Sequence, residues 1–287
     1  MPVSLGAILT PIITPFDARG RVDEEAAVRV MHHVVDHGSD GLVLCGTTGE
    51  AATLSDEEQL GVIGLAVGEM GIHCTVIAGV GSNDTRHAMH LTERATELGA
   101  HALLSVNPYY NRPSRRGIVR HFEAVASATD VPILLYNIPQ RTGSDMPNDL
   151  LAELAQLDNI VGVKQSNPAN LAKIDGLQIY AGNDDMLADV LDLGEPGGIV
   201  VASHLFGEQM RQMVDEPERR HEIEDSLRDV FRDLAIAPLA CSVKAALNLL
   251  GLEVGAPRLP YVELDDQETA TVRTMLERHG MLATAAG

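Results

Sequence analysis

The chain has 287 residues, 45% of them hydrophobic, and a formal net charge of −20. A surface this acidic repels nucleic acid and anionic membranes, so neither is an expected partner. No stretch approaches the roughly 18–20 uninterrupted apolar residues of a membrane span. Residues 1–6 also lack the basic start of a secretory signal, and we therefore expect a cytoplasmic protein.

Short apolar runs alternate with amphipathic segments along residues 1–204. The runs are apolar on both faces, as buried parallel strands are, and cover 7–13, 41–46, 74–80, 101–106, 131–138, 160–164, 177–181 and 198–202. The segments between them that favour helices include 23–37, 55–69, 84–98, 115–129 and 147–156. Ser55 and Asn83 are the predicted caps of two of these helices. Eight strands, each followed by a helix, predict an α/β fold of the (β/α)₈ barrel type.

The pattern changes after residue 204. Residues 205–250 carry apolar side chains at helical spacing only, for example Ile223, Leu227 and Val230, and a last helix fits 266–280. No linker rich in Gly, Pro or Ser separates this part from the rest. We therefore predict a barrel over 1–204 and a C-terminal helical extension over 205–287 that packs on it.

In such barrels the active site lies at the carboxyl ends of the strands, and the sixth run ends there in Lys164. Lysine is rarely buried without a partner. Burial lowers the pKa of an amine, and the neutral amine is the nucleophile that forms a Schiff base with a ketone. Gly162, on the same strand face, is interpreted as leaving room for a ligand. The alternative is a lysine whose stem packs while its ammonium group reaches solvent.

Two other runs end in residues suited to such a site. Tyr136 ends the fifth run. If the fifth and sixth strands are neighbours, it lies about 5 Å from Lys164, where a phenol can transfer protons. It could equally be an aromatic plug at the end of the barrel. The second run ends in Gly46-Thr-Thr-Gly-Glu50, a tight turn whose hydroxyl and N–H groups suit a carboxylate.

The histidines and cysteines indicate no metal site. Two pairs of histidines have helical spacing, His33 with His37 and His87 with His90. Neither pair has a carboxylate in a zinc-binding pattern, and both are expected to face outward from their helices. The cysteines are far apart and form no Cys-x-x-Cys motif: Cys45, Cys74 and Cys241. We predict no metal, no disulfide and no cofactor.

Taken together, the chain resembles the dihydrodipicolinate synthases, in the superfamily that includes N-acetylneuraminate lyase. The resemblance covers nearly the whole chain and rests on segments 46–50, 107–113, 136–143, 161–164 and 242–247. It implies class I aldolase-type chemistry, in which Lys164 forms a Schiff base with pyruvate. The product with L-aspartate 4-semialdehyde would be 4-hydroxy-tetrahydrodipicolinate, in lysine (diaminopimelate) biosynthesis.

The resemblance also implies roles for the surrounding residues. Thr48 would hold the pyruvate carboxylate, and Tyr136, Thr47 and Tyr110 would form a proton relay. In the family, the tyrosine that matches Tyr110 is delivered across a subunit interface. A homo-oligomer, either a tetramer or a dimer, is therefore implied.

The remaining implied positions concern the two substrates. Gly182 and Val200 match positions that line the pyruvate pocket, and Arg141 matches the arginine that receives the carboxylate of the aldehyde. A guanidinium group there suits a small charged aldehyde better than a neutral sugar chain. Two alternatives stay open: an aldolase or lyase for 2-keto-3-deoxy sugar acids, and a non-catalytic protein on the same barrel. The chain also departs from the family in carrying Gln165-Ser166 where an acidic residue usually follows the lysine.

The feedback site for lysine is poorly matched. Relatives that respond to lysine carry His and Glu at positions that here read Asp56, Gln59 and His87, and only Asn83 and Tyr109 fit. We expect lysine to inhibit this protein weakly or not at all.

The balance of charged residues generates a prediction about salt. The chain has only three lysines against eighteen arginines, and 41 acidic residues. This balance suggests a host with high internal salt, where screening removes self-repulsion. The midpoint of thermal unfolding should rise as KCl is added to a dilute buffer. A chain already fully stable without salt would contradict this prediction.

Overall fold

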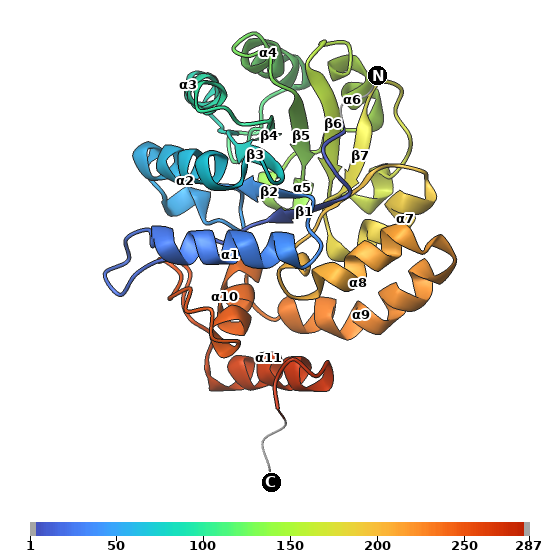
Figure 1. The fold of residues 1–287 in the computed structure, drawn as a ribbon. Helices are drawn as coiled ribbons and strands as arrows, with labels where there is room; N and C mark the ends of the chain where they lie inside the picture. Colours follow the sequence, from blue (N-terminus) through green and yellow to red (C-terminus); the bar gives the residue numbers. More distant parts are fainter. Residues whose placement is uncertain (1–3, 284–287) are drawn as a thin grey trace.

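A computed structural model describes residues 4–283 and shows a closed barrel of eight parallel strands in sequence order (Figure 1). The strands are β1 Ile8–Pro11, β2 Gly41–Leu44, β3 Thr75–Gly79, β4 Ala102–Val106, β5 Ile133–Asn137, β6 Ile160–Gln165, β7 Gln178–Ala181 and β8 Gly197–Ile199. Each neighbouring pair is parallel, and β8 closes the barrel on β1. The predicted barrel is confirmed.

Helices surround the strands on the outside (Figure 1). They are α1 Glu24–Asp36, α2 Asp56–Met70, α3 Thr85–Glu97, α4 Arg115–Ala126, α5 Pro139–Thr142, α6 Asn148–Leu154, α7 Leu187–Asp192 and α8 Ser203–Asp215. Ser55 caps α2 in a capping box with Glu58, as its sequence predicts. The cap predicted at Asn83 is wrong by one residue, because the Asp84 side chain accepts the Arg86 N–H at the start of α3.

The prediction that every strand is followed by a helix is wrong after β6. Only a 3₁₀ turn, η2 Pro168–Asn170, lies between β6 and β7. The connection from Gln165 to Gln178 is close to the minimum length of a helical crossover, roughly 10–12 residues. Pro168 and Gly176 also interrupt it.

Three more helices follow the ring: α9 Arg220–Leu234, α10 Leu239–Leu249 and α11 Asp266–Arg278. Helix α8 packs on β1 and α1, α9 packs on α8, and α10 pairs with α11 at one side of the barrel (Figure 1). The division at residue 204 stays a prediction, although α8 takes the place of an eighth barrel helix. No helix within residues 4–283 is long and apolar enough to cross a bilayer.

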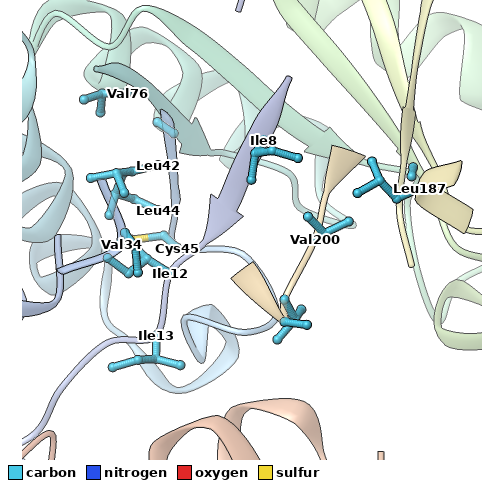
Figure 2. Close-up of a cluster of buried hydrophobic side chains, with 14 of the residues drawn as sticks. Ile8, Ile12, Ile13, Val34, Leu42, Leu44, Cys45, Val76, Leu187 and Val200 are labelled. Atoms are coloured by element: carbon cyan, nitrogen blue, oxygen red, sulfur yellow. The ribbon is translucent and has the colours of Figure 1, made fainter. Parts of the chain in front are cut away.

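Alternating side chains of the strands fill two separate hydrophobic cores. Leu9, Val43 and Leu134 point into the barrel with Tyr136. Their neighbours along the strands, such as Ile8 and Leu42, face the helices (Figure 2).

The same alternation accounts for Gly162. A Cβ at this position would lie 2.8 Å from Leu134 Cδ2 and 2.6 Å from the Gln178 carbonyl oxygen. The interpretation that Gly162 leaves room for a ligand is therefore wrong, because Leu134 already fills that space. The glycine permits close packing inside the barrel instead.

His204 joins α8 to the end of β1. It is fully buried; its Nδ1 lies 2.8 Å from the Val201 carbonyl oxygen and donates to it, and its Nε2 accepts the Ile13 N–H at 3.2 Å. Both ring nitrogens are thus used by the neutral form. Burial lowers the pKa of His204 from 6.5 to about 4.

The neutral state of His204 makes stability depend on pH. Its folded pKa is depressed, so its contribution is complete above about pH 6.5 and is lost as the pH falls towards 4. The free energy of unfolding in urea should fall between pH 7 and 5, and His204→Asn should flatten this dependence. The exposed His73 supplies the control, since His73→Gln should leave the slope unchanged. An identical slope in His204→Asn and the unsubstituted protein would contradict the argument.

Candidate active site

Lys164 and Tyr136 stand side by side at the carboxyl ends of β6 and β5. They are register partners, and the Lys164 Nζ lies 4.6 Å from the centroid of the Tyr136 ring. The predicted adjacency is confirmed. Only 6% of Lys164 is exposed, so the alternative in which its ammonium group reaches solvent is contradicted.

Burial sets the protonation of both groups. It lowers the pKa of Lys164 from 10.5 to about 8, with the Asp184 charge opposing this shift and the Arg141 charge adding to it. Burial raises the pKa of the Tyr136 phenol, and the side chains of Ser166 and Thr47 oppose that change. Near neutral pH the site therefore holds an amine that can lose its proton and a phenol that keeps its own.

A cavity of about 100 Å³ contains most of the predicted site residues. Six of them line it: Lys164, Tyr136, Thr47, Thr48, Arg141 and Gly182. The cavity adjoins a larger one of about 510 Å³, and Thr47, Tyr136 and Arg141 line both. The arrangement gives a small ligand a deep seat beside the amine and a second molecule space towards the outside.

Two predicted site residues lie elsewhere. Val200 is fully buried in the core that also contains Ile8 and Leu187 (Figure 2). Its neighbour Val201 lines the cavity instead, because adjacent side chains point to opposite sides. Tyr110 is 88% exposed and lines neither cavity of this single chain.

The Gly46–Glu50 turn presents two threonines in different settings. Thr48 is buried, whereas Thr47 is exposed towards the cavity mouth. The Glu50 N–H donates to the Thr47 carbonyl oxygen at 3.1 Å, and the Thr14 hydroxyl donates to the Gly49 carbonyl oxygen at 2.7 Å. Glu50 itself takes a left-handed conformation with φ 57°, which is unfavourable for a residue with a side chain.

A buried ion pair fixes this turn to the C-terminal helices. The Lys244 Nζ of α10 donates to Glu50 Oε1 at 2.5 Å, and the Arg258 N–H donates to Glu50 Oε2 at 2.9 Å. The side chains of Glu50 and Lys244 are 0% and 1% exposed. Sequence reasoning missed this pair. Lys244 is one of only three lysines and follows the apolar start of α10, but nothing local identifies its partner.

Gln165 is held in a network behind the site, although it departs from the residue usual in the family. Its Oε1 accepts from Asn137 Nδ2 at 3.0 Å and from the Asn167 N–H at 3.0 Å. Asn137 Nδ2 also lies 2.9 Å from the Asp145 carboxylate. The Gln165 oxygen therefore accepts from the donors that surround it, whereas its Nε2 is buried without a hydrogen-bond partner within residues 4–283.

The larger cavity contains the residues singled out for lysine feedback. Asp56 and Gln59 line it with His87 and Tyr109. The His87 Nε2 lies 2.9 Å from Asp56 Oδ1, and its Nδ1 lies 3.1 Å from the Ser82 hydroxyl. The His87 ring and the Asp56 carboxylate are therefore hydrogen-bond partners of each other. Weak lysine inhibition stays a prediction.

No group of three or more His, Cys, Asp or Glu side chains that could hold a metal lies within residues 4–283. The His33 Nε2 donates to the His204 carbonyl oxygen at 3.0 Å, and its ring lies 4.5 Å from that of His37. The prediction that this pair faces outward is wrong for His33, which is half-buried against α8.

Comparison with known proteins gives one consistent result. Residues 4–279 match the model of the dihydrodipicolinate synthetase family. The chain is 40% identical to the 4-hydroxy-tetrahydrodipicolinate synthase of Heliobacterium modesticaldum, over 98% of each chain. It resembles the dihydrodipicolinate synthase of Cyanidioschyzon merolae solved with lysine bound (35% identity, TM-score 0.93, 97% and 99% of the two chains). It also resembles the chloride-inhibited enzyme of Acinetobacter baumannii complexed with pyruvate (31%, TM-score 0.91, 97% and 100%).

The Glu50–Lys244 pair yields a prediction about stability. Glu50→Gln leaves a buried, unpaired ammonium group and should lower the free energy of unfolding by roughly 3–5 kcal/mol. The double variant Glu50→Gln/Lys244→Met should lose less, because no charge remains buried. Both can be measured by urea denaturation.

A surface pair supplies the control. Arg94 and Glu97 are 48% and 61% exposed. Glu97→Gln should change stability by less than about 1 kcal/mol. Equal losses in the single and double variants at positions 50 and 244 would show that the charge interaction is not the cause.

Proposed function

The chain belongs to the dihydrodipicolinate synthetase family, and we propose that it condenses pyruvate with L-aspartate 4-semialdehyde to give 4-hydroxy-tetrahydrodipicolinate. This is the activity for which its relatives are named. The reaction is of the class I aldolase type, and the enzyme is a lyase. The observation that carries the proposal is the buried Lys164 amine, which has no ion-pair partner within residues 4–283 and lies beside Tyr136 in a small cavity.

Lys164 is the proposed nucleophile. With a pKa of about 8, roughly a tenth of the amine is neutral at pH 7, against far less than one per cent for an ordinary lysine. The neutral Nζ attacks the keto carbon of pyruvate, and the carbonyl oxygen leaves as water. Tyr136, whose ring lies 4.6 Å from the Nζ, is placed to donate and recover the protons of this exchange.

The Gly46–Glu50 turn is the proposed site of the pyruvate carboxylate. Thr48 is buried and lines the cavity. Its hydroxyl and N–H are the donors that we assign to the carboxylate. Thr47 acts on the Tyr136 hydroxyl, in line with its effect on the pKa of that phenol. Glu50 and Lys244 keep the turn in place from behind.

Arg141 is the proposed receptor of the second substrate. It lies in α5, is exposed, and lines both the deep cavity and the outer one. A guanidinium group can hold a carboxylate with two parallel hydrogen bonds. This position suits the carboxylate of aspartate semialdehyde while its aldehyde reaches the bound pyruvate.

We also propose a homo-oligomer, either a dimer or a tetramer. Tyr110 is 88% exposed and holds a left-handed backbone conformation with φ 71°. A bulky residue adopts this conformation only where something compensates for the strain. Insertion of Tyr110 into the site of a partner would complete the proton relay with Tyr136 and Thr47. The cytoplasmic location stays a prediction.

The nucleophile can be identified by trapping. Borohydride reduction with pyruvate should label the peptide that contains Lys164, and Lys164→Ala should lose the label and roughly 10³-fold or more of the activity. The exposed Lys173 supplies the control, because Lys173→Ala should keep both. Below pH 8 the rate of labelling should fall about tenfold per unit, since only the neutral amine reacts. Labelling at another residue would remove the proposed mechanism.

The role of Arg141 can be separated from that of Lys164. Arg141→Ala should raise the KM for aspartate semialdehyde roughly 10- to 100-fold, the worth of a charged hydrogen bond. Pyruvate should still be trapped at Lys164, with the pH midpoint of trapping moved upward, because the Arg141 charge that lowers the Lys164 pKa is lost. Arg120 is 80% exposed in its side chain on α4, and Arg120→Ala serves as the control. Preferred turnover of 2-keto-3-deoxygluconate by the unsubstituted protein would favour the sugar-acid alternative instead.

A further inference from the structure

Asp184 is a buried acid immediately behind the wall of the catalytic cavity. It begins η3 (Asp184–Met186), just beyond β7, and is 9% exposed. Its Oδ1 accepts the Val201 N–H at 2.6 Å and the Ala202 N–H at 3.0 Å. Since Val201 lines the catalytic cavity, Asp184 fixes part of that wall.

The wall at this point is held from two sides. While Asp184 receives the N–H of Val201, the His204 ring donates to the Val201 carbonyl oxygen at 2.8 Å. Gly182 donates its N–H to the Gln165 carbonyl oxygen at 2.8 Å, which joins the segment before Asp184 to the end of β6. The position of Asp184 relative to Lys164 is thus set by backbone hydrogen bonds.

A second cavity, of about 660 Å³, lies on the other side of this wall. It shares Gly182, Asn183, Val201 and Leu239 with the catalytic cavity. Asp184 lines this second cavity and does not line the catalytic one. Asp184 therefore lies outside the catalytic cavity, where it would not contact a bound substrate.

Two charged side chains affect the pKa of Lys164, and Asp184 is the negative one. Asp184 raises the pKa of the Lys164 amine, and Arg141 from α5 lowers it. The other titratable neighbours of Lys164 on the adjacent strands are the phenols Tyr136 of β5 and Tyr180 of β7.

Charged side chains of both signs lie near Asp184. Asp185 follows it in η3, and Glu224, Arg228 and Arg232 of α9 face the same second cavity. Burial raises the pKa of Asp184 to about 6, which leaves it ionised at neutral pH. Within residues 4–283 its carboxylate forms no ion pair, and its partners are the two backbone N–H groups.

We propose that Asp184 is a positioning residue whose negative charge stabilises the iminium formed on Lys164. The proposal rests on the Schiff-base function proposed above. In that step the neutral amine adds to the keto carbon, and the carbonyl oxygen leaves as water with both amine protons. The nitrogen of the new C=N bond then takes up one proton, which Tyr136 is proposed to donate, and becomes positively charged. A fixed carboxylate in a buried setting stabilises such a charge far more than it would in water.

The test removes the charge and keeps the hydrogen bonds. In Asp184→Asn the side-chain oxygen can still accept from Val201 and Ala202. The pH midpoint of borohydride trapping with pyruvate should move down by roughly one unit, because the amine loses a charge that favours its protonation. Above that midpoint, where the free amine is neutral, the concentration of pyruvate that half-saturates trapping should rise roughly tenfold. The exposed neighbour gives the control: Asp185→Asn should change neither quantity.

The outcomes separate this inference from the proposed function. If the unsubstituted protein is not trapped at Lys164, the proposed function fails. If it is trapped there, and Asp184→Asn keeps its pH midpoint and its half-saturating pyruvate, the role of Asp184 is overturned even where the rate falls. Asp184→Glu, which restores the charge, should keep the original midpoint. Should Asp184→Asn not fold, Asp184→Ser retains a hydroxyl acceptor and carries the same expectation.

Discussion

Burying an amine at the mouth of a closed barrel removes it from water, and the neighbouring elements determine how far this shifts its charge. Strand β5 brings the Tyr136 ring beside Lys164, α5 brings the positive Arg141, and η3 brings the negative Asp184. The result is a pKa of about 8, close enough to neutrality for the amine to react. The site depends on this balance of charges. An amine in a direct ion pair would stay protonated and could not attack a ketone. An amine with no negative charge nearby would not stabilise the positively charged iminium.

The chain's three lysines show how surroundings decide function. Lys173 is exposed, whereas Lys164 and Lys244 are buried. Lys244 donates directly to the Glu50 carboxylate and lies 4.0 Å from the centroid of the Phe16 ring. Its pair holds the turn that presents Thr47 and Thr48, so its role is structural. Lys164 has no such partner among the described residues, which leaves its amine available for the proposed attack on a ketone.

The C-terminal helices contribute to the site from outside the barrel. Helix α10 supplies Lys244, and the loop that follows supplies Arg258, which also holds Glu58 at the start of α2. Leu239, the first residue of α10, lines the catalytic cavity itself. The region beyond the barrel therefore lines part of the site and fixes its turn, while the strands carry Tyr136 and Lys164.

Most of the strands and helices, and the adjacency of Tyr136 and Lys164, could be predicted from the sequence alone. Buried strands and amphipathic helices have local periodicities, and strand order in this fold follows chain order, so the adjacency of Tyr136 and Lys164 could be predicted. Only the tertiary structure showed what fills the space beside Gly162, which side Val200 faces, and why no helix follows β6. It also decided the partners of the buried charges. Glu50 meets Lys244 across 194 positions, and Asp184 meets the turn after β8. Such contacts arise when the barrel closes and the C-terminal helices pack on it, and no local pattern records them.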